Sequence, residues 1–197
     1  MKDIWAKAKS DQEILHFKNF QQPDVTWEDA LKFVYDLSFD YASKEFKEQA
    51  ERNPDVLYLY GKIIFNKGYF LFEESNLFKH FKGIEELMSR VNGGVSGKDC
   101  LHYTGWDNFG ECSCNQQWHI QTLRLSIGEH KVENHNDPCD VLYWQVLGNS
   151  TWVMNDSTEY VLEPGDLLYF NKEDTHRVLQ DSPRAGIIID GPRWQMA

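Results

Sequence analysis

Two histidines and one aspartate carry the side chains that could hold a metal ion. His135 and Asp137 are separated by one residue, and His176 follows much later in the chain. Two neutral imidazoles and one carboxylate form the facial triad that binds non-haem Fe(II) and leaves other coordination positions open. Open positions on iron bind a co-substrate and dioxygen. These three residues therefore indicate an iron site that could support oxidation chemistry.

The elements that must position these residues are short strands. From Trp118 onward, apolar or alternating runs are separated by turn residues such as Gly128 and Pro164-Gly165. This pattern predicts eight strands with no helix between them, which is the strand count of a jelly roll. The predicted strands are Trp118–Ile127, Lys131–Asn136, Val141–Leu147, Thr151–Met154, Glu159–Leu162, Leu167–Phe170, His176–Leu179 and Ala185–Asp190.

The order of these strands predicts that the three ligands converge. His135 and Asp137 end the second strand on the same face, because side chains alternate between faces with a period of two. His176 opens the seventh strand, which lies beside the second in a rolled jelly roll. Taken alone, a His-x-Asp sequence is more often a polar turn, and a single histidine is more often a surface residue. The joint pattern of strands and turns favours the metal site, with His119 and His130 as candidates for supporting roles.

The first 94 residues are expected to form helices and one strand pair. Ser10 and Glu13 have the spacing of a capping box, which predicts that a helix starts there, and Thr26 can cap a second helix. The other elements expected are a helix at Ser43–Arg52, strands at Val56–Phe65 and Tyr69–Phe72, and a helix at Phe78–Val91. We interpret residues 1–94 as an extension packed on a barrel of residues 95–197. Residues 95–115 are expected to be a long loop, either a substrate lid or an ordinary surface loop.

The residues from Gly128 to Trp152 resemble the iron-binding segment of the JmjC-type, cupin-like 2-oxoglutarate oxygenases. In that family a His-x-Asp pair leads to an apolar strand that ends in Gln-Val-x-Gly, as residues 145–148 do here. Residues 164–178 are similar to the family's distal-histidine motif. The resemblance covers the C-terminal part from Gly128 onward, and none is identified for the N-terminal half.

The resemblance implies a mainly β fold, a double-stranded β-helix (a cupin-like jelly roll) with the N-terminal helices packed on it. It implies that His135, Asp137 and His176 bind Fe(II) and that 2-oxoglutarate is the co-substrate. It also implies an enzyme, a 2-oxoglutarate-dependent dioxygenase that hydroxylates a protein side chain or a small molecule.

One departure from the family pattern concerns the residue that anchors 2-oxoglutarate. The family commonly places a basic residue just after the glycine turn, where this chain has Ser150. Arg184 is a substitute, since other double-stranded β-helix oxygenases place their arginine near the last strand. A guanidinium can form two parallel hydrogen bonds with a carboxylate. A solvated arginine is an equal alternative, and Arg124 and Tyr143 are weaker candidates for the same role.

The composition limits the classes of partner that the protein is expected to bind. The net charge is −11, with acids and bases mixed along 197 residues, which disfavours binding to a nucleic-acid backbone. The acidic balance slightly favours a basic protein or a small molecule as substrate. No apolar run predicts a membrane span and no signal region is evident, so a cytoplasmic protein is the default expectation. The four cysteines contain no CxxC pair and are expected to be reduced.

Two other functions remain open at this point. One is a cupin that binds a metal but runs a different chemistry, such as an isomerase or a dioxygenase that uses no 2-oxo acid. Asp137, in place of a second histidine, argues against this alternative. The other is a metal-free jelly roll, including a degenerate oxygenase, that only binds a partner. Ser150 keeps that alternative open.

Overall fold

The computed structural model describes residues 2–32, 62–66, 81–91, 118–126, 132–137, 139–155, 157–179 and 182–191. Several expected elements lie outside these described residues: the helix at 43–52, the strand at 69–72 and the loop at 95–115. Among the described residues, none of the helices has the length and apolar character needed to cross a bilayer.

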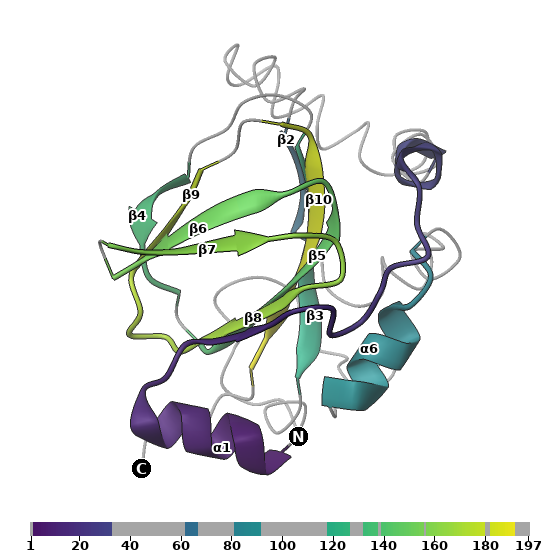
Figure 1. Ribbon diagram of the computed structural model, residues 1–197. Helices are drawn as coiled ribbons and strands as arrows, with labels where there is room; N and C mark the ends of the chain where they lie inside the picture. The colour runs from purple at the N-terminus through teal and green to yellow at the C-terminus, as the bar shows by residue number, and fades with distance from the viewer. Residues whose placement is uncertain are drawn as a thin grey trace.

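Eight strands in the C-terminal part form two antiparallel sheets (Figure 1). These strands are β3 (His119–Ser126), β4 (Val132–His135), β5 (Val141–Leu147), β6 (Ser150–Met154), β7 (Thr158–Leu162), β8 (Leu167–Phe170), β9 (His176–Leu179) and β10 (Arg184–Asp190). Each predicted strand is confirmed, with its ends within one residue of the prediction. The agreement follows from turn residues that interrupt every apolar run.

The strand order identifies the fold. One sheet contains β8-β5-β10-β3 and the other is β4-β9-β6-β7, so successive strands cross between the sheets at almost every step. This winding is that of a double-stranded β-helix, or jelly roll. The fold is therefore mainly β, as the sequence predicts.

Two strands from the N-terminal region extend the first sheet. β1 (Leu15–Phe17) pairs with β8, and β2 (Lys62–Asn66) pairs with β3. β2 begins inside the predicted strand at 56–65 and ends one residue later; residues 56–61 lie outside the described part. The division of the chain at residue 94 stays a prediction.

The predicted helix start at Ser10–Glu13 is wrong. Helix α1 (Lys2–Asp11) ends there instead. Gln12 has a left-handed φ of 54°, and the backbone N–H of Glu13 donates to the carbonyl of Ala8 at 2.8 Å. This is the hydrogen bond of a Schellman cap, which closes a helix at its C-terminus. The residues that follow are then available to pair with β8 as β1.

Two further predicted helix starts lie in or beside described residues and are confirmed in part. Thr26 forms a reciprocal cap with Asp29: the Thr26 Oγ1 accepts from the Asp29 N–H, and the Thr26 N–H donates to the Asp29 carboxylate. Helix continues to residue 32, where the described segment ends. Helix α6 (Ile84–Val91) begins later than the predicted Phe78, because Gly83 has a left-handed φ of 93°.

Buried side chains form two clusters, one on each face of β5. Val141 and Tyr143 point into the barrel, between the two sheets, whereas Leu142 and Trp144 point to the outer face. The outer cluster is covered by α6 and by the N-terminal segment, whose Gln21 carbonyl accepts from the Trp144 indole at 2.8 Å. Both faces of β5 are therefore buried, which explains why all of its residues except Gln145 are hydrophobic.

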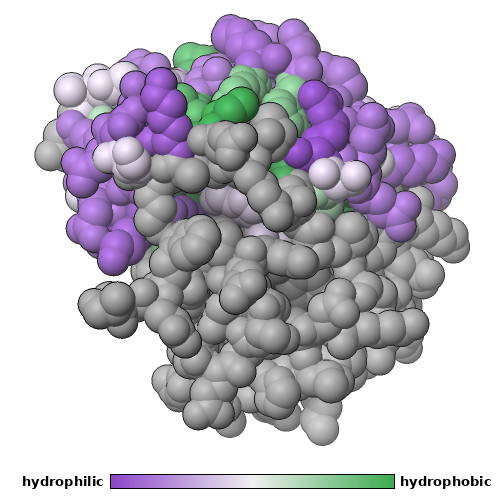
Figure 2. Space-filling view, turned by 90° about the horizontal axis from the view of Figure 1, so that it is seen from below, coloured by the Kyte–Doolittle hydropathy of each residue, from purple (hydrophilic) through white to green (hydrophobic). Residues whose placement is uncertain are grey.

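The described surface is mainly hydrophilic on the face seen in Figure 2, with one small hydrophobic area toward its centre. The core lies between the two sheets and beneath α6, and the end of β4 lies beside the start of β9.

Candidate metal centre

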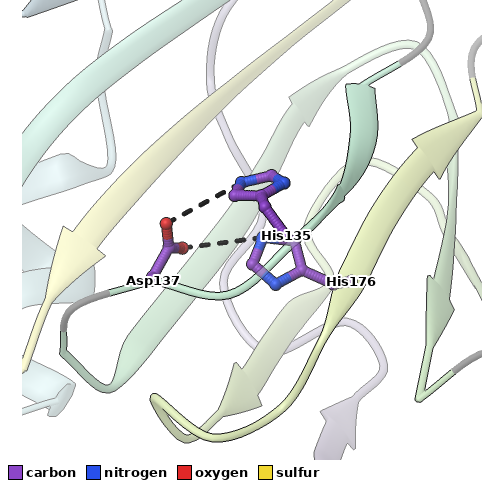
Figure 3. Close-up of side chains that lie close together, drawn as sticks. All are labelled: His135, Asp137 and His176. Atoms are coloured by element: carbon purple, nitrogen blue, oxygen red, sulfur yellow. Dashed lines mark ion pairs between the residues drawn. The ribbon is translucent and has the colours of Figure 1, made fainter.

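The end of β4 and the start of β9 bring the three predicted ligands together. His135 is the last residue of β4, His176 is the first residue of β9, and the antiparallel register pairs them directly. Asp137 follows β4 by two residues. Its carboxylate faces both rings in Figure 3, with one oxygen 3.8 Å from the Nε2 of His135 and the other 3.6 Å from the Nε2 of His176.

The geometry of these three side chains fits one divalent cation. One ligand atom from each lies within 4.8 Å of the others. Ligand atoms that bind one ion at about 2.1 Å are roughly 3 to 3.5 Å apart, so these ligand atoms need to approach one another by at most about 1.8 Å to bind an ion. Two imidazoles and one carboxylate suit Fe(II) with open positions. The donor set and its spacing therefore fit the group that the sequence implies.

The two histidine rings are oriented by backbone carbonyls. The Nδ1 of His135 lies 2.8 Å from the carbonyl of Glu133, and the Nδ1 of His176 lies 3.4 Å from the carbonyl of Asp174. A carbonyl oxygen can only accept, so each contact favours the tautomer with its proton on Nδ1. The lone pair of each Nε2 then faces Asp137, as a metal ligand requires.

One side of the site is solvent-accessible and the other is closed. The side chain of His135 is 36% exposed and that of Asp137 is 23% exposed, whereas that of His176 is only 2% exposed. The His176 ring packs against Phe170 at 4.6 Å and Trp152 at 5.4 Å between centroids. These aromatic rings restrict the rotamers of His176 and exclude water from the barrel side of the site.

Ser150 positions one of these aromatic rings, that of Trp152. Its hydroxyl is hydrogen-bonded on both sides, so it does not face the site as a free hydroxyl. Its Oγ donates to the Oε1 of Gln145 at 2.7 Å and accepts from the Trp152 indole at 3.1 Å. Gln145 is in turn bound to the backbone carbonyls of the turn after β5. The chain Gln145–Ser150–Trp152 therefore positions the ring that packs on His176. Sequence reasoning identified Ser150 only as the missing anchor and overlooked this role.

Arg184 is buried, which excludes the alternative of a solvated arginine. It is the first residue of β10, only 3% exposed, and its Nη1 has no hydrogen-bond partner within the described part of the chain. The Tyr143 hydroxyl is likewise buried without a partner there. A Cβ on Gly186 would lie 2.0 Å from the Tyr143 Oη, so this hydroxyl lies against β10, two residues from Arg184.

These unpaired donors match a buried site for a carboxylate. A buried guanidinium nitrogen without a hydrogen-bond partner is unfavourable, because its lost hydration is not replaced. An anion that binds Arg184 and Tyr143 would restore the missing hydrogen bonds. The assignment of these two residues to 2-oxoglutarate stays a prediction.

The other candidate residues are less informative. Arg124 lies on β3, where its backbone pairs with Gly186 and Ile64, but its side chain is outside the described part. His119 starts β3 opposite Asp190, so its backbone lies at the other end of β3 and β10 from Arg184. Its side chain is not described, and His130 lies outside the described residues.

Sequence reasoning also missed a side-chain hydrogen bond that attaches β1 to the barrel. The Nε2 of His16 lies 2.9 Å from the Asp166 carboxylate, which also accepts from the backbone N–H groups of Asn19 and Glu163. Burial raises the pKa of Asp166, but these hydrogen bonds outweigh burial and hold that pKa below its usual range. No local pattern in the sequence joins His16 to Asp166, since they are far apart in the chain.

Comparisons with known proteins find structural overlaps of limited extent. No protein-family model matches the chain, and no curated protein matches it. A cupin superfamily protein from Desulfitobacterium hafniense aligns with 36% of this chain and 66% of its own at 19% identity and a TM-score of 0.34. An RmlC-like cupin with a double-stranded β-helix fold from Methanocaldococcus jannaschii aligns with 38% of this chain and 71% of its own, at 13% identity and a TM-score of 0.35.

The ribosomal oxygenase YcfD of Escherichia coli also overlaps with part of this chain. It aligns with 40% of this chain at 22% identity and a TM-score of 0.33, and the matched part is 24% of its own length. Because these overlaps are partial, the fold is assigned from the strand order and register of the chain itself.

Proposed function

We propose that this protein is an Fe(II)- and 2-oxoglutarate-dependent oxygenase that hydroxylates a protein side chain or a small molecule. The observation that carries the proposal is the convergence of His135, Asp137 and His176, with one ligand atom from each within 4.8 Å of the others. The two histidines come from paired strands, so the arrangement is set by the barrel and not by a single loop.

In this proposal His135, Asp137 and His176 bind Fe(II), and the Asp137 carboxylate neutralises one of its two charges. When bound, Fe(II) together with 2-oxoglutarate and dioxygen supplies the oxidising chemistry that inserts an oxygen atom into a C–H bond. The remaining roles belong to the chain's own residues, which orient ligands, anchor the co-substrate and exclude water.

Arg184 is proposed to anchor the distal carboxylate of 2-oxoglutarate, because it is a buried cation whose Nη1 has no partner among the described residues. The Tyr143 hydroxyl, also without a partner in the described part, is proposed to donate a further hydrogen bond. A guanidinium and a phenol hydroxyl together match the lone pairs of a carboxylate. Arg124 remains a weaker candidate.

A co-substrate consumption assay tests the proposal. Purified protein is incubated in air with 2-oxoglutarate, with and without added Fe(II), and succinate is measured by NMR. We expect Fe(II)-dependent conversion that His176→Ala abolishes. Arg177→Ala is the matched control, since Arg177 neighbours His176 on β9 but is exposed, and it should retain the conversion.

A parallel measurement of Fe(II) binding, read together with this assay, separates the alternatives. A protein that binds Fe(II) but leaves 2-oxoglutarate unchanged would be a metal-binding cupin with another chemistry. A protein that binds no metal would be a jelly-roll binding module. Either result would contradict the proposed oxygenase.

A further inference from the structure

The β6–β7 turn makes contact with the loop that leads into His176. The backbone N–H of Asn155 donates to the carbonyl of Thr175 at 2.8 Å. The Asn155 side chain adds two bonds: its Oδ1 accepts from the Thr175 N–H at 3.1 Å, and its Nδ2 donates to the Asp174 carboxylate at 2.8 Å. One asparagine therefore holds the two residues that precede His176.

Asp174 connects Asn155 to His176, because it contacts both residues. It is buried, and its second carboxylate oxygen accepts from the backbone N–H of Asn171 at 3.0 Å. The carbonyl of Asp174 lies 3.4 Å from the Nδ1 of His176. The direction of that carbonyl depends on the loop conformation, which the Asn171 and Asn155 bonds fix. The contacts thus run from Asn155 through Asp174 to the imidazole of His176.

Asn155 also has a backbone conformation that few residues adopt. Its φ is 47°, in the left-handed region that asparagine tolerates better than most other residues. The Ser157 N–H donates to the Met154 carbonyl at 3.2 Å and closes the turn around it. Since β6 pairs Met154 with His176, this turn is adjacent to the metal centre through the sheet register.

We propose that Asn155 is a positioning residue for His176. Its side-chain amide fixes Asp174 and Thr175, so that the Asp174 carbonyl meets the Nδ1 of His176 and the Nε2 faces Asp137. This inference rests on the proposed function to the extent that it requires a metal at the centre; it does not require 2-oxoglutarate. Residues that orient a metal ligand in this way commonly change metal affinity by 10- to 100-fold when replaced.

The sharpest test exchanges the asparagine at position 155 and the aspartate at position 174, first singly and then together. Asn155→Asp replaces the donating amide with a second carboxylate that faces Asp174, so the bond is lost and repulsion is added. Asp174→Asn removes the acceptor for one of its two N–H donors. In the double variant, the aspartate at position 155 accepts from Thr175 and from the new asparagine, and that asparagine accepts from Asn171. Every hydrogen bond of the network can then form again.

The sign of the charge change makes the Asn155→Asp result independent of long-range electrostatics. Asn155→Asp adds a negative charge near the cation, which by Coulomb's law would strengthen metal binding. A loss of affinity in this variant therefore reports on geometry. The double variant keeps the original net charge.

Two measurements are made on these variants and on the control Ser157→Ala. Ser157 lies in the same turn but is exposed. The affinity for Mn²⁺ is measured by calorimetry, and the tautomer of His176 is measured by ¹⁵N NMR in the metal-free protein. We expect each single variant to lose roughly tenfold in affinity and to populate a mixture of tautomers. The double variant should return to within about threefold of wild type, and Ser157→Ala should match wild type.

The outcomes distinguish this inference from the proposed function. If the single variants bind Mn²⁺ like wild type, or the double variant fails to recover, the positioning role is wrong. If wild type binds no metal, both proposals fail. If the exchange behaves as expected but 2-oxoglutarate is not consumed, only the oxygenase assignment fails. Should a single variant fail to fold, recovery of affinity and tautomer in the double variant still supports the positioning role, and a lack of recovery overturns it.

Discussion

His135 and His176 are direct cross-strand partners of β4 and β9, and their ring centroids lie 4.3 Å apart. The separation of the two imidazoles is therefore set by the register of two backbone strands. Any shift of β9 against β4 would move one ligand relative to the other. Metal binding and the pairing of these strands should consequently stabilise each other.

The first prediction is that metal stabilises the fold through this pair. A ligand that binds only the folded state at 100 times its dissociation constant adds about 2.7 kcal/mol to the free energy of unfolding. Mn²⁺ should therefore raise the Tm of wild type and of Arg177→Ala, and leave the Tm of His135→Ala unchanged. Thermal unfolding followed by circular dichroism checks this. An equal rise in His135→Ala would show that the metal binds elsewhere.

The second prediction separates the role of Arg184 in binding from any role in stability. Arg184→Met should bind 2-oxoglutarate at least about tenfold more weakly, because a charged hydrogen bond contributes roughly 1.5 to 3 kcal/mol. The variant without ligands should be at least as stable as wild type, since a buried guanidinium with an unsatisfied donor is removed. Calorimetric titration and urea unfolding measure the two effects.

Arg177→Met is the matched control for this experiment, because the same substitution is made at an exposed position. It should leave 2-oxoglutarate affinity unchanged. Unchanged affinity in Arg184→Met as well would remove Arg184 from the proposed site and leave Arg124 as the candidate.

The third prediction concerns Gly186, where no larger residue fits. Its added Cβ would lie 2.0 Å from the Oη and 2.3 Å from the Cζ of Tyr143. Gly186→Ala should lower the free energy of unfolding by about 1 to 3 kcal/mol, because the Tyr143 ring must move within a packed interior. Tyr143→Phe should change stability little, since the hydroxyl it removes has no partner among the described residues. Urea denaturation midpoints of both variants check this contrast. A Gly186→Ala variant with the same free energy of unfolding as wild type would contradict it.

The fourth prediction is a pH dependence that arises at Asp166. Its pKa in the folded protein lies below the usual value of 3.8, which the unfolded chain regains. A carboxyl with a lowered folded-state pKa stabilises the fold above the unfolded value, and this stabilisation is lost as the pH falls through the folded-state value. The effect should therefore be complete at neutral pH and disappear in acid below 3.8.

Asp166→Asn tests this assignment. At pH 7 the variant should be less stable than wild type by about 1 to 3 kcal/mol, because at least one buried N–H donor loses its acceptor. The difference should shrink at about pH 3, below the unfolded-state value of 3.8, because the unfolded chain of wild type then binds a proton that the folded chain binds less readily. Urea unfolding at both pH values measures it. A difference that stays constant with pH would show that the Asp166 carboxylate charge is not involved.

The eight strands of the barrel and the convergence of the three candidate metal ligands could be predicted from the sequence. Each strand is a short apolar run that ends in residues such as Pro164-Gly165, and this information is local. The convergence of His135 with His176 could be predicted because a jelly roll has few possible strand orders.

The residues at 10–13 show where local information fails. The same Ser-x-x-Glu spacing is compatible with a helix start, but the left-handed conformation of Gln12 makes it a helix end. What decides between the two is the pairing of Leu15–Phe17 with β8, about 150 residues away in the chain. A local capping motif contributes about 1 kcal/mol, so a tertiary contact of this kind can override it.

The sequence alone determined which residue types are available for chemistry and which segments alternate as strands, because both depend on neighbouring positions. Only the tertiary structure decided that Arg184 is buried, that Ser150 holds Trp152, that His16 pairs with Asp166, and that Asn155 contacts the loop before His176. Burial and side-chain hydrogen bonds depend on which distant segments meet, and that information is present only once the chain has folded.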